Sequence, residues 1–156
     1  MIHVSVQEDP FDSGALLKPL EALGGGGVAS FTGLVRGDGG LVELLLEHHP
    51  GMTENVIRSL VEEAIARWSL LGAVVVHRHG PMTPGEAIVM VGTAARHRGE
   101  ALDACTFLID RLKTEAPFWK RERFVDGRTA WVEPRCTDDS AARRWTQAIA
   151  ESGLSL

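Results

Sequence analysis

Residues 73–115 read AVVVHRH GPMTPG EAIVMVGTAA RHR GEALDACTFLIDRLKTE, where spaces separate two apolar runs, a loop, a basic tripeptide and a helical segment. The runs at 73–79 and 86–95 are rich in β-branched residues and are predicted to be strands, joined by a Gly/Pro loop at 80–85. The segment 99–115 is predicted to be a helix whose buried stripe consists of Ala101, Leu102, Cys105, Leu108, Ile109 and Leu112. Strands and helices mixed in this way favour an α+β fold.

Upstream of this core, residues 12–23 form a predicted helix that Asp12 or Ser13 caps and that Gly24–Gly27 ends. Residues 28–35 and 41–48 are two further strand segments. Because only a short glycine-rich turn separates them, we expect them to pair as an antiparallel hairpin. The next helix, capped by Thr53, runs to about Leu70.

Downstream, a second hairpin is predicted from 123–125 and 129–133, with Asp126-Gly127 as its turn. A last helix should start at Asp138 or Asp139 and run to about Ala150. Residues 151–156 are expected to fray, as chain ends commonly do.

Composition places the chain among ordinary globular proteins. It has 156 residues, of which 44% are hydrophobic and 24% charged, so a single domain over 1–156 is expected. The net charge of -5 argues against a general nucleic-acid binder. There is no apolar run of about 20 residues and no leader pattern, so no membrane association is expected and a cytoplasmic location is the default. The two cysteines give neither a disulfide framework nor zinc-ligand spacing.

Basic residues gather at three places. Arg36 ends a predicted strand beside a glycine turn. Arg96-His97-Arg98 lies at the start of a helix, where free N–H groups and the helix dipole favour an anion, and Gly99 leaves room for one. Lys113 and Lys120 flank Pro117-Phe118-Trp119. From the residues alone, these places indicate an anion pocket.

Two other patterns carry less weight. The four glycines at 24–27 precede a strand rather than a helix, and no Gly-Lys-Ser/Thr follows, so a phosphate loop is not expected. His48 and His49 are neighbours on a strand and point to opposite faces, which makes a poor metal site. No metal is predicted.

Six motifs follow one another between residues 28 and 135: FTGLVR at 31–36, LEHHPGMT at 46–53, HRHG at 77–80 with PGE at 84–86, ARHR at 95–98, LKTEAPFWKRE at 112–122 and WVE at 131–133. In this order they resemble the large, catalytic subunits of molybdopterin synthase. The loop after Arg36 is shorter and richer in glycine than is usual in that family. His49 stands where the family often has tyrosine.

The resemblance implies a sulfurtransferase of molybdenum cofactor biosynthesis, which converts cyclic pyranopterin monophosphate to molybdopterin by installing two sulfur atoms as a dithiolene. The sulfur comes from a thiocarboxylate on the C-terminal Gly-Gly of a small ubiquitin-like carrier subunit. The large subunit is expected to be a homodimer with one carrier at each end, a heterotetramer that uses no cofactor. The implied fold is an α/β hammerhead with an additional antiparallel β subdomain.

The basic residues suit that reaction. The substrate carries a phosphate and the donor a thiocarboxylate, so Arg36, His97, Arg98 and Arg135 are predicted to bind substrate. Sulfur transfer needs a group that moves protons, and a lysine among other cations can serve. Lys113 is the predicted catalytic acid or base, and Lys120 is predicted to assist it.

Two alternatives remain open. One is a homodimeric anion-binding module that has lost activity, although the intact set of basic residues argues against it. The other is a sulfurtransferase that uses Cys105 or Cys136 as nucleophile. Reactive thiolates need exposure and nearby positive charge, which disfavours Cys105 on a buried helix face and leaves Cys136, next to Arg135, as the better candidate.

Overall fold

The computed structural model describes residues 1–132 and residue 145. Its elements are β1 (Ile2–Gln7), α1 (Ser13–Glu21), β2 (Gly27–Leu34), the short 3₁₀ helix η1 (Asp38–Gly40), β3 (Leu41–His48), α2 (Met52–Trp68), β4 (Gly72–Arg78), β5 (Gly80–Met82), β6 (Ala87–Ala95), α3 (Arg98–Glu115), β7 (Phe118–Phe124) and β8 (Thr129–Trp131). Sheet A has the strand order β1-β4-β6-β2, and sheet B the order β5-β3-β7-β8. The predicted α+β class is confirmed. In the described part of the chain, no helix is long and apolar enough to cross a bilayer.

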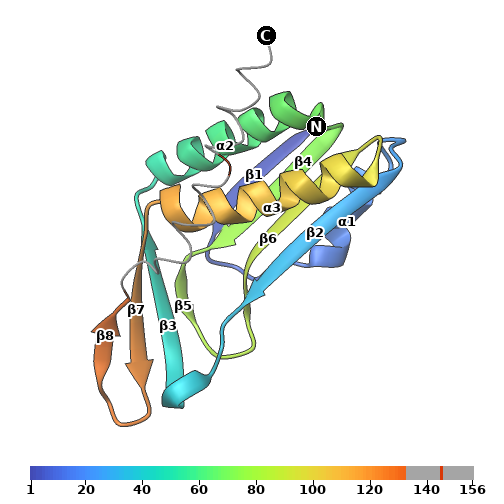
Figure 1. Cartoon of the computed structure of the whole chain (residues 1–156). Coiled ribbons are helices and arrows are strands. Elements are labelled where there is room, and N and C mark those ends of the chain that lie inside the picture. Colours follow the sequence, from blue (N-terminus) through green and yellow to red (C-terminus); the bar gives the residue numbers. More distant parts are fainter. Residues whose placement is uncertain (133–144, 146–156) are drawn as a thin grey trace.

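Sheet A lies between two layers of helix, as Figure 1 shows, with α2 and α3 over one face and α1 over the other. The main core fills the space under α2 and α3 and includes Ile57, Val61 and Phe107, all 0% exposed. Leu20 of α1 seals the opposite face at 1% exposure. Because both faces are covered, every residue of β4 is buried, which explains why its first five residues, Gly72 to Val76, are all apolar.

Sheet B is wholly antiparallel and continues from the end of sheet A where β2 and α3 finish (Figure 1). It has its own small core of Val35, Leu44, Leu46 and Met82, against which Phe118 packs. This sheet corresponds to the antiparallel subdomain that the family resemblance implied. The hairpin predicted around Asp126-Gly127 is confirmed, since Arg123 pairs with Thr129 across a turn in which Gly127 has φ +85°.

The hairpin predicted from 28–35 and 41–48 is wrong. β2 pairs with β6 of sheet A, whereas β3 pairs with β5 and β7 of sheet B. A register shift at Gly33/Leu34 and the positive φ angles of Gly39 and Gly40 turn the chain out of one sheet and into the other. A short glycine-rich connection therefore marked a change of sheet, which strand propensity alone does not distinguish from a hairpin.

Other local predictions also need correction. Strand β1, which pairs in parallel with β4, and the three-residue strand β5 were absent from the prediction. Leu102, expected in the buried stripe of α3, is 57% exposed.

The start of α2 differs too. Its N-cap is Gly51, at φ +81°, and Thr53 lies inside the first turn, where its hydroxyl donates to the carbonyl of His49 at 3.0 Å. Of the predicted last helix, only Trp145 belongs to the described residues, and it is helical. The predicted fraying of 151–156 lies outside them.

Candidate functional site

The first basic group lies where α3 begins. His97 is the N-cap of α3 and makes no side-chain cap bond, and Arg98 is the first helical residue. Both side chains are exposed. A Cβ added at Gly99 would meet nothing within 4 Å, so the backbone there is open to a ligand. The first N–H groups of a helix lack intrahelical partners and carry partial positive charge, and with two basic side chains beside them they can bind an anion.

The glycine run lies directly behind this helix start. A Cβ on Gly26 would stand 2.3 Å from the carbonyl oxygen of Arg96, and one on Gly27 would stand 3.2 Å from the Cα of Arg98. The Gly26 N–H donates to the Ala95 carbonyl at 3.0 Å. Glycine at positions 26 and 27 therefore lets the chain pass close behind Arg96-His97-Arg98, a role that was not predicted from the sequence.

The second basic group lies at the other end of α3. Lys113 is exposed in the last turn, and Lys120 is exposed on β7, opposite Leu46 of β3. Arg36 follows the end of β2; its side chain is 65% exposed and its Nε lies 3.6 Å from Asp38 Oδ2. Because β2 and α3 both run antiparallel to β6, they point the same way, so the end of β2 lies toward the end of α3 (Figure 1).

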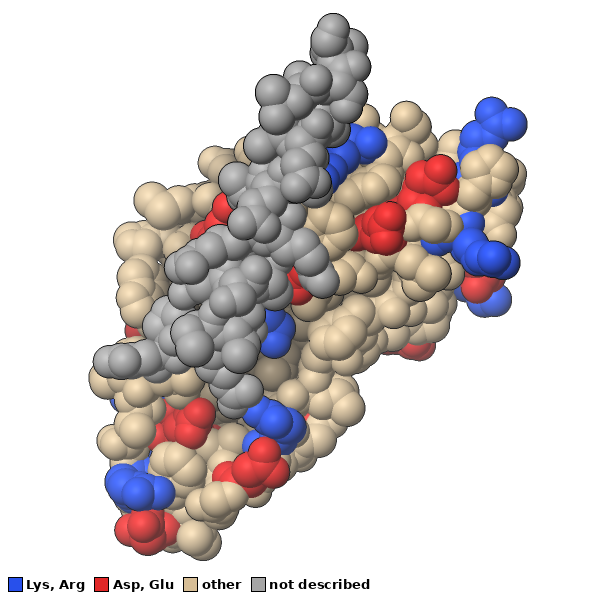
Figure 2. All heavy atoms as spheres, viewed as in Figure 1, with Lys and Arg blue, Asp and Glu red and all other residues tan. Residues whose placement is uncertain are grey.

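The two groups are far apart within one chain. Arg98 and Lys113 are separated by most of α3, which at 1.5 Å per residue amounts to about 22 Å. Figure 2 shows basic side chains toward both ends of the face that carries α3, with acidic ones between them. The structure therefore brings Arg36, Lys113 and Lys120 to one end and His97 with Arg98 to the other, rather than into a single pocket. Arg135 lies outside the described residues.

Three histidines and Phe118 form a cluster next to Lys120, which the sequence analysis missed. The rings of His77 and Phe118 stack at 3.8 Å, and those of His48 and His79 lie 4.3 Å apart. His77 Nδ1 donates to the carbonyl of Arg78 at 2.8 Å. Burial lowers the pKa of His77 to about 4, and the charge of Lys120 acts in the same direction. His77 is therefore neutral at physiological pH and forms an uncharged floor near the Lys120 ammonium group.

Among the described residues there is no group of three or more His, Cys, Asp or Glu side chains that could hold a metal ion. His77 and His79 lie close to His48 and Phe118 in the folded chain. His48 and Phe118 are paired across β3 and β7, which completes the cluster. The contacts that create the cluster join residues 31 positions apart (His48 and His79) and 41 positions apart (His77 and Phe118), so no local signal marked it.

Comparison with known proteins decides the family. The MoaE protein family matches residues 6–115 of this chain. The chain belongs to the MoaE family. The molybdopterin synthase catalytic subunits of Ralstonia nicotianae and Cereibacter sphaeroides are 48% and 47% identical to it, over 93% and 92% of this chain and 85% and 100% of their own lengths. The resemblance inferred from the six motifs is confirmed.

Solved structures agree with the fold. The molybdopterin biosynthesis MoaE protein from Burkholderia ambifaria superposes with a TM-score of 0.80 at 43% identity, covering 94% of this chain and 99% of that one. A protein-protein complex of subunits 1 and 2 of molybdopterin-converting factor from Helicobacter pylori gives a TM-score of 0.72 at 18% identity, covering 85% of this chain and 91% of that one. The second likeness concerns the fold alone.

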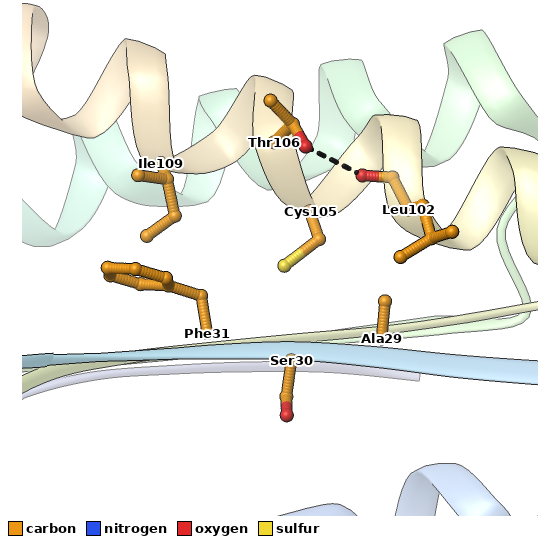
Figure 3. Close-up of a pocket in the computed structure, with 7 residues that line it drawn as sticks. All are labelled: Ala29, Ser30, Phe31, Leu102, Cys105, Thr106 and Ile109. Carbon is orange, nitrogen blue, oxygen red and sulfur yellow. Dashed lines mark hydrogen bonds between the residues drawn. The ribbon is translucent and has the colours of Figure 1, made fainter.

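A narrow cleft of about 250 Å³ separates β2 from α3 in this MoaE-family chain (Figure 3). Ala29 and Phe31 point toward α3, and Leu102, Cys105 and Ile109 point back toward β2. Burial raises the pKa of the Cys105 thiol to about 11, so the thiol stays protonated at physiological pH. Cys105 is therefore an apolar wall of the cleft and a poor nucleophile. Cys136, the better cysteine candidate, lies outside the described residues.

Proposed function

We propose that this chain is the catalytic subunit of a molybdopterin synthase and works as one domain, residues 1–156, in the cytoplasm. It transfers sulfur from the C-terminal thiocarboxylate of a small ubiquitin-like carrier to cyclic pyranopterin monophosphate, which yields the dithiolene of molybdopterin. The observation that carries the proposal is the pair of basic groups at the two ends of α3 in a chain of this family. An anionic substrate and an anionic donor both need such groups.

Each basic residue has a proposed role. His97, Arg98 and Arg36 bind the anionic parts of the substrate, and Arg135 is assigned to the same task from the sequence. Lys113 moves the proton that sulfur transfer requires, and Lys120 stabilises developing charge beside the neutral His77 floor. Lys113 is exposed in the isolated chain. In the proposed assembly, the carrier tail and a second protomer shield it from water.

The two groups can meet if two chains associate. β2 is an edge strand of sheet A, and among the described residues no strand pairs with its outer side. Val28, Phe31 and Leu34 of β2 are 40%, 41% and 56% exposed, and Leu102 across the cleft is 57% exposed. An uncovered apolar edge strand is a ready surface for pairing with another chain. We infer that two β2 strands pair antiparallel around a two-fold axis.

Such pairing would bring together the ends that a single chain keeps apart. Gly27, at the start of β2, lies against Arg98, and Arg36 comes two residues after the end of β2. Antiparallel pairing sets the start of one β2 strand beside the end of the other. His97 and Arg98 of one protomer would then face Arg36 and Lys113 of its partner, so each dimer would hold two equivalent sites.

The carrier is proposed to deliver its sulfur by threading an extended Gly-Gly tail toward Lys113. Glycines lack side chains, so such a tail can pass close to the backbone of the large subunit. Main-chain hydrogen bonds would hold the tail, and contacts with the body of the carrier would provide selectivity. Sedimentation of the chain alone and with carrier tests the assembly: a strict monomer, or a complex unaffected by deleting the last two carrier residues, would overturn it.

Reconstitution tests the activity. The chain is mixed with thiocarboxylated carrier and cyclic pyranopterin monophosphate, and molybdopterin is assayed. We expect product from the wild type and a loss of most turnover from a folded Lys113→Ala variant, with Lys120→Ala impaired less. Lys18→Ala is a matched control, because Lys18 is an exposed lysine on α1, across sheet A from α3. Normal single-turnover product formation by Lys113→Ala would refute the catalytic assignment.

A further inference from the structure

The backbone on both sides of Arg36 rests on the loop between β5 and β6. The Val35 N–H donates to the Glu86 carbonyl, and the Gly85 N–H donates to the Val35 carbonyl, each at 2.9 Å. On the other side, a Cβ added at Gly37 would stand 3.3 Å from Pro84 Cβ, so the chain passes close over that proline. Arg36 is thus held between two neighbours that both contact residues 84–86.

The Glu86 carboxylate holds this loop in shape. One oxygen, Oε2, accepts from the Thr83 N–H and from the Thr83 hydroxyl, the latter at 3.0 Å. The other, Oε1, accepts from Arg78 Nη1 at 3.1 Å. The Thr83 N–H, then the Arg78 guanidinium and then the Thr83 hydroxyl keep the pKa of Glu86 below its ordinary value. Glu86 is therefore ionised at physiological pH and ties the loop to Arg78.

Arg78 is itself fixed in the body of the protein. It lies at the end of β4, is 5% exposed, and donates from Nε and Nη2 to the carbonyl of Glu8 at 3.0 and 2.9 Å. A buried guanidinium needs a carboxylate partner, and within the described residues Glu86 is the one that forms an ion pair with it. The chain of contacts runs from buried β4 through Arg78 and Glu86 to the backbone beside Arg36.

The strand ladder does not extend to Arg36. The register of β2 and β6 shifts between Gly33 and Leu34, and Leu34 is the last paired residue of β2. Beyond it, the Arg36 side chain is largely exposed and contacts Asp38, which is 80% exposed, at 3.6 Å. An exposed ion pair of this kind stabilises little. The direction of Arg36 therefore depends on the loop that Glu86 braces.

We propose that Glu86 is a positioning residue that acts through Arg36. By tying residues 83–86 to buried Arg78, it keeps the Arg36 guanidinium in the orientation that binds the anionic part of the substrate. This inference rests on the proposed function, because it takes the substrate role of Arg36 as given. Preorganised charge binds more tightly than mobile charge, because less freedom is lost on binding.

The test is a double-mutant cycle on substrate affinity. Cyclic pyranopterin monophosphate is titrated into the wild type, Glu86→Gln, Arg36→Ala and the double variant. We expect Glu86→Gln to raise Kd roughly ten-fold, the loss typical of one hydrogen bond to a charged group. In the Arg36→Ala background, Glu86→Gln should leave Kd almost unchanged, because the guanidinium that Glu86 is proposed to orient is no longer there. In turnover, KM for the substrate should rise while kcat stays within about two-fold.

The outcomes separate the two ideas. If Arg36→Ala binds substrate normally, the proposed substrate role of Arg36 fails and the inference fails with it. If Arg36→Ala loses affinity for the substrate while Glu86→Gln does not, the positioning role of Glu86 is overturned and the substrate role of Arg36 stands. The same holds if the fold-increases in Kd of the two single variants simply multiply in the double variant. Glu86→Asp, which keeps the charge, should recover part of the affinity.

Controls guard against a general loss of stability. Leu20→Ala destabilises sheet A from the α1 side, far from this loop, and should leave Kd unchanged at a similar loss of Tm. Should Glu86→Gln not fold, Thr83→Ala removes only the hydroxyl bond and is expected to raise Kd about two- to three-fold. An unchanged Kd for a folded Thr83→Ala would contradict the brace.

Discussion

Mixed dimers give the sharpest test of the shared site. Arg98 and Lys113 are about 22 Å apart along α3, so one small substrate cannot contact both in the same chain. If sites form between protomers, a dimer of one Arg98→Ala chain and one Lys113→Ala chain holds one intact site and one doubly defective site. Random mixing at equal concentration makes half of the dimers mixed, so turnover should recover to about a quarter of the wild-type value.

The assay is straightforward because each variant alone should be nearly inactive. The two are mixed under mild denaturation, allowed to re-associate, and assayed for molybdopterin with excess carrier. Lys113→Ala mixed with Lys120→Ala is the matched control. Lys113 lies in the last turn of α3 and Lys120 lies on β7 at the same end of the chain, so every site in that mixture carries a defect and turnover should not exceed the average of the two variants measured alone. If Arg98→Ala with Lys113→Ala recovers no more than the control, the site does not draw on two chains in this way.

Three further predictions follow from the titrating and charged groups. Between pH 8 and pH 5 a histidine in the unfolded chain, with its ordinary pKa of 6.5, takes up a proton that His77 in the folded chain, with a pKa of about 4, does not. The free energy of unfolding should therefore fall by about 2 kcal/mol as the pH drops. Urea unfolding of His77→Gln should show a smaller fall than the wild type, and an equal fall would contradict the low pKa of His77. Asp38→Asn removes an exposed competitor 3.6 Å from Arg36 and should tighten substrate binding by up to about five-fold, whereas weaker binding in a titration would be inconsistent with that role. Cys105→Ala should keep wild-type turnover and lose about 1 kcal/mol of stability, because its thiol is buried and protonated; loss of turnover in a folded variant would restore the cysteine mechanism.

The local elements could be predicted because their signals are local. The cap of α1 by Asp12, whose carboxylate accepts from the Ala15 N–H at 3.1 Å, is visible as an acidic residue before a helical run. The same holds for the Asp126-Gly127 turn and the apolar stripe of α3 around Cys105 and Leu108. Each depends on residues a few positions apart, so propensity and spacing contain the necessary information.

Partner choice between strands was not predictable in the same way. β2 and β3 have similar strand character, and what separates them is the bulge at Gly33/Leu34 together with packing of Val35 against sheet B. These are long-range contacts of the folded chain. The prediction that Leu102 is buried was wrong for a related reason: it lies on the apolar side of the helix, but among the described residues no strand continues sheet A beyond β2 to cover it. An exposed apolar residue at such an edge indicates a missing neighbour rather than an error of spacing.

The separation of the two basic groups was present in the sequence all the same. Arg96-His97-Arg98 comes just before the predicted helix 99–115, and Lys113 is near the end of that helix. The length of the helix therefore sets the distance between the two basic groups. A helix of that length is rigid and cannot fold back on itself, which means that no arrangement of one chain places Arg98 beside Lys113. Any site that uses both must therefore involve two copies of the chain, and the exposed edge of β2, which runs in the same direction as α3, is the surface that would align them head to tail.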